Sequence, residues 1–446
     1  MKQKKLSKFG GFLERKPRGG TLHLTVALLV FAFTAVMLGC KENGETPLTG
    51  VAHNPAIPVE VNTFMPDSGG IRTKFVIKGS NFGNDKSKVS VFFKDNETER
   101  KAVIIGINNE TIYCLAPRQN GGSNIVRVEV DGKAASTAKT FKYLVAENVS
   151  HIVGVRGEGR ATDGSLAEGR INRTFGIAAL GNDELLTFES LVNTVRFISV
   201  PSNKIITIQT SFDGTQPAIT KDRSKVYSIG RSFPHRVYVY EKNTLWAPKI
   251  VAAQIASAPG IIMSACLDNE EQWLYFRERG GAFGRMEIAN PTNVEIIKAV
   301  TPGANSGDYN YMSYSPIEDC FYYTVQGQHS VYKMSKAGDV ELYAGNGLGR
   351  SDGFRTDAQF NQGSGILVDL DGNIWIADSS NHTIRKINKN SGFVSTVAGI
   401  PGVQGASSGI PALSTFDYPY AFAVDENNAM FIGESWGCTL RKLAIE

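Results

Sequence analysis

A short pattern near the C-terminus constrains the fold more than any other part of this chain. Residues 371–387, DGNIWIADSSNHTIRKI, read as a tight turn, a strand of branched and aromatic residues, a polar loop and a half-exposed strand. The apolar run 365–369 before this pattern and residues 395–398 after it complete four short strands. A four-stranded sheet of this size cannot bury both of its faces alone, so the pattern predicts further copies that pack against it.

Copies of the pattern recur along the C-terminal two thirds of the chain. The position of Trp375 is matched by Leu186, Tyr227, Tyr275, Tyr322 and Phe431, and successive members of the series are 41, 48, 47, 53 and 56 residues apart. This spacing is typical of propeller blades, so residues 146–446 are predicted to form a six-bladed β-propeller.

The last copy of the pattern contains only three strands. Residues 150–154, SHIVG, match the pattern of residues 395–399, STVAG, which form the outer strand one blade earlier. We therefore expect the first strand of the propeller to complete its last blade, because closing the ring in this way removes an exposed sheet edge.

Two families are recognisable in these residues. The copies at 371–399 and 423–443 resemble NHL repeats, and FMPDSGGIRTKFVIKGSNFG, residues 64–83, resembles the opening of an IPT/TIG domain, an immunoglobulin-like sandwich. The alternation of Thr73, Phe75 and Ile77 with polar residues agrees with a sheet that has one buried face. The predicted fold class is all-β, with an immunoglobulin-like sandwich at residues 60–145 followed by a six-bladed NHL-type propeller. The chain is similar to bacterial surface lipoproteins with this domain order.

The N-terminal segment has the features of a lipoprotein signal peptide. Residues 1–39 hold seven Lys/Arg and one Glu, and an apolar run at 22–38 leads into Gly39 and Cys40. We expect residues 1–39 to be removed, Cys40 to carry lipid, and residues 40–59 to form a flexible tether. The predicted location is the cell surface, lipid-anchored in an outer membrane. The alternative is an ordinary signal peptide or a membrane anchor with an incidental cysteine.

The net charge excludes one class of partner. Beyond residue 39 the chain holds 40 basic and 42 acidic residues, a net charge of −2, so nucleic acid is not an expected partner. The expected partner is a glycan or a surface protein, and the chain is predicted to be a monomer. The remaining cysteines are Cys114, Cys266, Cys320 and Cys438. Their spacing does not fit a zinc site, and the sequence does not assign disulfide pairs among them.

An enzyme is the main alternative to a binding protein. Propellers related to the NHL type include metal-dependent lactonases and lyases, whose site residues converge on the central channel. The residues available for such a site are the carboxylates Glu189, Asp378 and Glu434 and the propeller histidines His151, His235, His329 and His382, of which the last three recur in one class of loop. In NHL-like repeats the pair Asn381–His382 is a structural turn feature. We therefore predict no metal, no other cofactor and no catalytic residue, and keep the lyase or lactonase reading as the alternative.

A binding surface is the favoured function. The loops between second and third strands, and those between blades, should share one face of the propeller. Aromatic rings beside planar polar groups on that face would suit a sugar, whose apolar ring face stacks while its hydroxyls form hydrogen bonds. The predicted binding residues are Phe233, Arg277, His329, His382, Glu434 and Trp436, with Arg231 and Arg279 on the same face. The alternatives are solvated loop side chains and a scaffold for protein–protein contacts.

Overall fold

The structure is a computed structural model that describes residues 50–445, apart from 97, 146, 256–257, 259 and 304–308. Within these residues the chain is built from β-strands, and its helices are 3-10 turns of three residues. None of the described helices is long and apolar enough to span a bilayer. The predicted signal segment at 1–39, Cys40 and the first part of the predicted tether lie outside the described residues.

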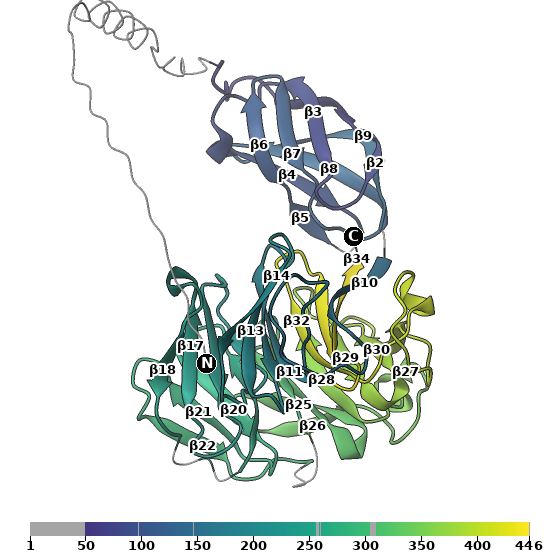
Figure 1. The fold of residues 1–446 in the computed structure, drawn as a ribbon. Helices are drawn as coiled ribbons and strands as arrows, with labels where there is room; N and C mark the ends of the chain where they lie inside the picture. The colour runs from purple at the N-terminus through teal and green to yellow at the C-terminus, as the bar shows by residue number, and fades with distance from the viewer. Residues whose placement is uncertain are drawn as a thin grey trace, which may run out of the picture.

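The N-terminal strands form a sandwich of two sheets, drawn in purple and blue in Figure 1. One sheet has the order β1-β3-β7-β6 and the other β2-β9-β8-β4-β5. The strands are β1 (Glu60–Met65), β2 (Ser68–Gly69), β3 (Lys74–Ser80), β4 (Val89–Lys94), β5 (Glu99–Lys101), β6 (Val103–Asn108), β7 (Thr111–Leu115), β8 (Gly122–Val130) and β9 (Lys133–Tyr143). Phe75 lies between the sheets, with its ring centroid 5.1 Å from that of Phe93 and 5.2 Å from that of Phe141.

The last strand of the sandwich begins earlier than its branched residues indicate. The sequence pattern predicts a strand from Thr140, whereas β9 starts at Lys133. Asp131 and Gly132 both have positive φ, 47° and 81°, which produces a tight hairpin between β8 and β9. Small and polar residues therefore continue the strand, because pairing with β8 holds them in place.

The remaining strands form the six blades of a propeller, coloured from teal to yellow in Figure 1. Blade 1 contains β11 (Thr174–Gly181), β12 (Glu184–Glu189), β13 (Thr194–Ser199) and β14 (Lys204–Gln209). Blade 2 contains β15 (Ala218–Ile219), β16 (Lys225–Ile229), β17 (Val237–Glu241) and β18 (Pro248–Ala252). Blade 3 contains β19 (Ile262–Leu267), β20 (Trp273–Glu278), β21 (Phe283–Glu287) and β22 (Val294–Lys298).

The second half of the ring repeats this arrangement. Blade 4 contains β23 (Met312–Ser315), β24 (Cys320–Val325), β25 (Ser330–Ser335) and β26 (Val340–Ala344). Blade 5 contains β28 (Gly363–Val368), β29 (Ile374–Asp378), β30 (Thr383–Ile387) and β31 (Phe393–Ala398), with β27 (Gly353–Phe354) on its outer edge. Blade 6 contains β32 (Pro419–Val424), β33 (Met430–Glu434) and β34 (Thr439–Ile445), and its outer strand is β10 (Glu147–Gly154).

The structure confirms the predicted repeat and its closure. Trp375 and the five residues matched to it all lie on the second strand of their blade. Strand β10 pairs antiparallel with β34, so the first strand of the propeller completes the last blade. Val149 and Val153 of β10 have no exposed surface, which shows that the closing strand is part of the core.

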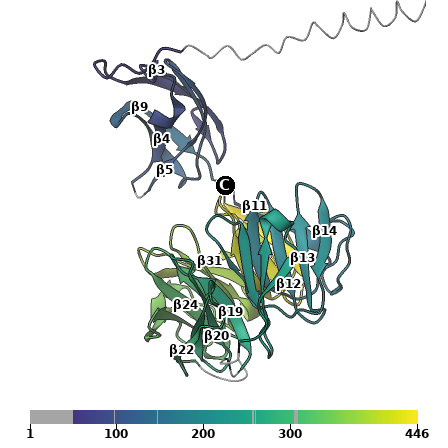
Figure 2. The same cartoon turned by 90° about the vertical axis from the view of Figure 1, so that its left-hand side faces the viewer.

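The propeller has two faces with different roles. The turn face carries the turns between first and second strands and between third and fourth strands. The loop face carries the loops between second and third strands and between blades. The sandwich contacts the turn face, as Figures 1 and 2 show it standing on one side of the propeller. Arg100 and Arg118 of the sandwich both bond the carboxylate of Asp371, in the turn between β28 and β29. The loop face therefore points away from the sandwich.

Candidate functional site

The recurring histidines of the loop face are turn residues. In every blade the last or second-last residue of the loop between second and third strands has positive φ, and these residues are Asn193, His235, Gly281, His329, His382 and Cys438. In the same loops Nδ1 of His382 accepts a hydrogen bond from the Tyr418 N–H at 3.3 Å. Nδ1 of His329 accepts one from the Gln362 N–H at 3.0 Å. Each of these two histidines therefore ties its loop to the start of the next blade, a contact that the sequence pattern alone does not reveal.

The described residues contain no group of three His, Cys, Asp or Glu side chains placed to hold a metal ion. The four described cysteines are buried free thiols and belong to no such group; they are Cys114, Cys266, Cys320 and Cys438.

The carboxylates Glu189, Asp378 and Glu434 occupy one structural position in three blades. Each ends a second strand, is buried, and faces a buried arginine of the third strand of the same blade. The pairs are Glu189–Arg196 at 3.6 Å, Asp378–Arg385 at 2.9 Å and Glu434–Arg441 at 3.9 Å. Each carboxylate also accepts an N–H from an inter-blade loop, from Asn172 at 3.0 Å, Asn361 at 2.7 Å and Asp417 at 2.8 Å. These carboxylates hold the loops to the blades.

Burial controls the protonation of this set. It raises the pKa of Glu189 to about 7, that of Asp378 to about 6 and that of Glu434 to about 8, against the pull of the facing arginines. Glu434 has no exposed surface, and both of its oxygens already accept hydrogen bonds, from the Asp417 N–H and the Thr439 hydroxyl, so it does not belong to the contact surface.

Arg277 is also buried rather than presented on the loop face. Its guanidinium lies 4.1 Å from the Tyr323 ring centroid and donates from Nη2 to Oγ1 of Thr301 at 2.9 Å. Burial lowers the pKa of Arg277 to about 10. The side chain lies on β20 and packs inside the propeller, so Arg277 does not belong to an accessible binding surface either.

Two predicted residues are exposed aromatic side chains. Phe233 is 69% exposed in blade 2, and Trp436 is 54% exposed in blade 6. The Arg173 guanidinium stacks on the Trp436 ring at 4.1 Å from its centroid, and the Tyr418 ring lies 5.9 Å away. Tyr418 in turn contacts His382 at 4.8 Å between ring centroids. We call Trp436, Arg173, Tyr418 and His382 the rim cluster.

A second aromatic group lies on the propeller axis, and no motif in the sequence indicates it. It derives from one repeat position at the start of each first strand, occupied by Phe175, Gln216, Met263, Tyr311, Ser364 and Tyr420. In four of the six blades this position falls in a register shift between the first and second strands. A β-bulge redirects a side chain out of the regular alternation, and here it turns the residue toward the axis.

Contacts across the ring confirm the axial position. Tyr311 of blade 4 lies 5.4 Å from Tyr420 of blade 6, and these two blades are not neighbours. Phe175 of blade 1 stacks on Tyr420 at 4.9 Å and meets Tyr309 at 5.8 Å. The guanidinium of Arg231 lies 4.8 Å from the Phe175 ring centroid. We call Phe175, Tyr309, Tyr311, Tyr420 and Arg231 the axial cluster.

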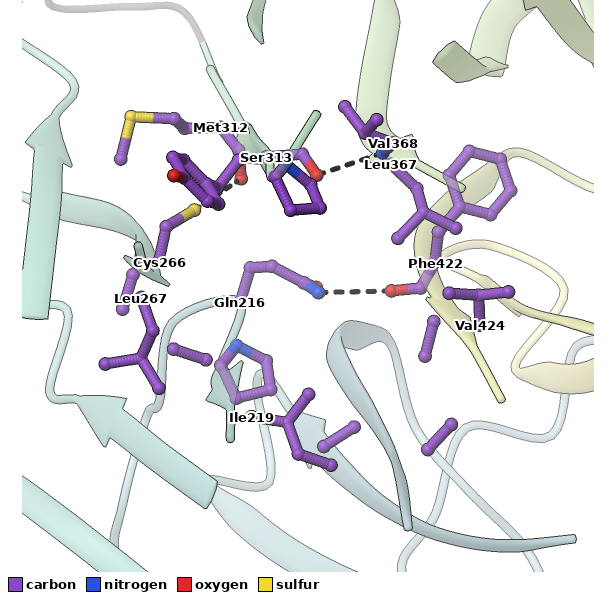
Figure 3. Close-up of a pocket in the computed structure, with 18 of the residues that line it drawn as sticks. Gln216, Ile219, Cys266, Leu267, Met312, Ser313, Leu367, Val368, Phe422 and Val424 are labelled. Atoms are coloured by element: carbon purple, nitrogen blue, oxygen red, sulfur yellow. Dashed lines mark hydrogen bonds between the residues drawn. The ribbon is translucent and has the colours of Figure 1, made fainter. Parts of the chain in front are cut away.

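Below the axial cluster, the channel continues as a cavity of about 230 Å³ that opens on the turn face. Figure 3 shows its walls, formed by apolar side chains such as Leu367 and Phe422, with Gln216 reaching across. The Gln216 amide donates to the carbonyl oxygen of Phe422 at 3.1 Å. Charged side chains, among them Lys221 and Glu271, lie where the cavity opens. The cavity therefore has apolar walls rather than the converging carboxylates and histidines that a channel metal would need.

Comparison with known proteins supports both domains. Residues 58–143 match the model of the IPT/TIG domain. A solved protein of unknown function from Bacteroides thetaiotaomicron VPI-5482 is 41% identical, and the alignment covers 89% of this chain and 100% of that one with a TM-score of 0.83. An auxiliary nutrient binding protein from Bacteroides ovatus ATCC 8483 is 19% identical over 89% of this chain and 100% of that one, with a TM-score of 0.58. At this identity the second likeness shows the fold alone.

The propeller repeats also have a curated relative. NHL repeat-containing protein 2 from Homo sapiens is 39% identical over 80 residues, which are 18% of this chain and 11% of that protein. The chain thus matches about a tenth of the length of that relative, and the likeness supports NHL-type repeats in the propeller.

Proposed function

The chain belongs to the same family as the Bacteroides thetaiotaomicron protein of unknown function, and from this premise we propose that it binds an extracellular glycan through the loop face of its propeller. Two Bacteroides proteins that share its fold are named auxiliary nutrient binding proteins, and this naming motivates a binding role at the surface. In this proposal the sandwich occupies the opposite face, so it holds the loop face outward without covering it.

The observation that carries the proposal is the exposed Trp436 in the rim cluster. A rigid indole with more than half of its surface exposed offers an apolar plane to a sugar ring. Stacking on Arg173 holds the indole in place, so little rotamer freedom is lost when a ligand binds. The Asp417 carbonyl oxygen accepts the N–H of Gly437, the residue after Trp436, at 3.1 Å. The Asp417 carboxylate accepts from Arg156 at 2.7 Å and from Gln404 at 2.6 Å, so planar polar groups lie near the loop of Trp436.

The anchor is a separate part of the proposal. Lipid on Cys40 would tether the protein to an outer membrane and leave the propeller outside the cell. Replacing Cys40 by Ala should move the protein from the membrane fraction to the soluble fraction or leave its precursor uncut. Unchanged fractionation with normal processing would contradict lipidation.

Glycan binding can be tested with purified protein in polysaccharide affinity gels and on a glycan array. The Trp436→Ala variant should bind the retained glycan at least tenfold more weakly, a loss of about 1.4 kcal/mol, while its Tm stays close to that of the wild type. The matched control is Leu245→Ala, which removes a side chain that is 86% exposed in the loop between β17 and β18. That loop lies on the turn face, so this variant should bind as the wild type does.

The outcomes separate the alternatives. Unfolding of Trp436→Ala would show that the indole is a core residue, and normal binding would place the glycan elsewhere. If wild-type protein binds no glycan, the proposed function is wrong, and a protein partner or a propeller enzyme becomes the better reading.

A further inference from the structure

The axial cluster keeps polar groups buried without full hydrogen bonding. Arg231 is 7% exposed, and among the described residues its Nε–H has no acceptor. Its Nη1 meets the Asp213 carboxylate only at 3.3 Å, and its Nη2 faces the Met263 sulfur at 3.9 Å. A guanidinium has five N–H donors, so most of the donor capacity of Arg231 is unused in the described structure.

Two hydroxyl groups add to this surplus of donors. Tyr311 and Tyr420 are 1% and 5% exposed, and their hydroxyls lie close to each other. Neither has a hydrogen-bond acceptor of good geometry among the described residues. Even when two hydroxyls bond each other, one O–H donor is left over. Buried polar groups are normally paired, so unpaired donors gathered at one point need an explanation.

The charge around these donors is positive. Arg231 and Arg279 both place their guanidinium groups over the ring of Tyr309, at 5.8 Å and 4.8 Å from its centroid. Among the described residues Asp213 is the carboxylate in ion-pair contact with Arg231, and it is 32% exposed at its side chain. A group that offers only acceptors and carries negative charge would match both the unused donors and the positive charge.

The cluster lies at the loop-face end of the axis and adjoins the rim cluster. Tyr309 and Arg279 are half-buried, so they form its outer surface. Tyr418 of the rim cluster and Tyr420 of the axial cluster are two residues apart, and so are Arg173 and Phe175. Two residues of extended chain span about 7 Å, a short separation that consecutive sugar units of one chain can bridge. One glycan chain could therefore stack on Trp436 and place its next unit at the axis.

From this geometry we infer that the axial cluster recognises the acidic group of the bound glycan, a carboxylate or a sulfate carried by a sugar ring. The inference rests on the proposed function and adds the chemical class of the ligand. Arg231 and the hydroxyls of Tyr311 and Tyr420 donate to the acid group, and Phe175 and Tyr309 contact the sugar ring. Neutral sugars lack the charge that this site can pair.

The probes for the test are polygalacturonate and alginate for carboxylates, carrageenan for sulfate, and dextran and galactan as neutral polymers. Acidic probes should bind at least tenfold more tightly than neutral ones, and added salt should weaken their binding. Comparison of polygalacturonate with its methyl ester tests recognition of the carboxylate, and comparison of carrageenan with galactan tests recognition of the sulfate. Probe binding should also raise the Tm, because it supplies partners to the buried donors.

Variants assign the effect to the axial cluster. Tyr420→Phe keeps the ring and removes one hydroxyl, so its Tm should stay normal while affinity for acidic probes falls several-fold. Arg231→Gln should lower that affinity at least tenfold, and Arg231→Lys serves if the glutamine variant does not fold. The matched control is Arg236→Gln, which changes an exposed arginine of the same loop and should leave binding unchanged.

The outcomes distinguish the inference from the proposed function. Binding of neutral glycans alone, lost in Trp436→Ala, would overturn the acidic site and leave glycan binding intact. Binding of acidic probes with wild-type affinity by Tyr420→Phe and by a folded Arg231 variant would also overturn it. If no probe binds to the wild-type protein, both the inference and the proposed function fail.

Discussion

Glu434 shows how the surroundings of a single residue decide its role. It ends β33 on the loop face, where its position in the repeat suits a ligand contact, yet its carboxylate is fully buried. One oxygen accepts the Asp417 N–H at 2.8 Å, and the other accepts a hydrogen bond from the Thr439 hydroxyl. Its contribution is therefore to stability, and this contribution depends on pH.

The sign of the pH dependence follows from the pKa of Glu434. Burial raises it from its ordinary 4.5 to about 8 in the folded protein, so folding favours the protonated form. The stability from this group is complete below about pH 4.5 and is lost as the pH rises through 8. We expect the Tm of the wild type to fall between pH 7 and 8, where each pH unit costs about 1.4 kcal/mol, or roughly 3 °C, and to level off above pH 8, where the group is ionised in both states.

The variant Glu434→Gln removes this titration and should show a flatter Tm curve between pH 7 and 8. Burial raises the pKa of Glu189 to about 7 and that of Asp378 to about 6, so these groups act mainly below that window. The control is Glu110→Gln, at an exposed turn of the sandwich. Parallel Tm curves for Glu434→Gln and the wild type would contradict the assignment.

At the scale of single elements, β10 closes the ring of blades. It pairs with β34 over residues Glu147 to Gly154, and it places Val149 and Val153 in two different core clusters. The carbonyl oxygen of Val149 also accepts the N–H of Gly409, and its N–H donates to the Gly409 carbonyl, both at 2.8 Å. Without β10, the outer edge of β34 would be unpaired and the ring would be open at that blade.

Two truncated chains test the closing strand, one beginning at residue 147 and one at residue 155. Both lack the sandwich, so they differ only in β10. The two buried valines alone account for about 3–6 kcal/mol of transfer free energy. We expect the shorter chain to melt more than 10 °C lower or to fail to fold, as followed by circular dichroism. Equal melting temperatures would show that the ring does not depend on β10.

At the scale of the whole molecule, one carboxylate joins the two domains. Asp371 accepts from Arg118 at 3.1 Å, from Arg100, and from the Asn428 amide at 3.3 Å. A groove of about 600 Å³, lined by both domains, lies beside this contact. The arginines are 22% and 19% exposed and Asp371 is 31% exposed, so each pair is partly screened and contributes about 1 kcal/mol or less.

Asp371→Asn should therefore loosen the sandwich from the propeller without unfolding either domain. Asparagine suits the tight turn at this position, so β28 and β29 should stay paired. Small-angle X-ray scattering should show a larger radius of gyration, while the Tm of the variant should stay within about 2 °C of the wild type. The control Asp131→Asn removes a surface ion pair inside the sandwich and should leave the scattering profile unchanged. An unchanged profile for Asp371→Asn would mean that other contacts hold the domains.

The amino-acid sequence by itself determined the number of blades, the order of their strands and the closure of the ring. These features follow from local sequence signals that recur in each blade. The signals are the alternation of apolar and polar residues, the turn residues, and the apolar or aromatic residue at the position of Trp375. Each signal depends on residues within about ten positions of one another. A chain that repeats these signals six times has few other ways to bury its sheets than a closed propeller. The turn role expected for Asn381–His382 was predictable for the same reason, and the structure confirms it through the positive φ of His382.

Only the tertiary structure decided which polar side chains are accessible and which meet at the axis. Arg277 and Phe233 were both predicted to lie on the loop face, yet Arg277 lies on β20, buried against a neighbouring blade, and Phe233 lies exposed in a loop. Phe175, Tyr311 and Tyr420 lie far apart in sequence and meet because bulges and ring closure bring three blades together. Burial and contact depend on side chains that converge from separate blades, and a local pattern carries no information about that convergence.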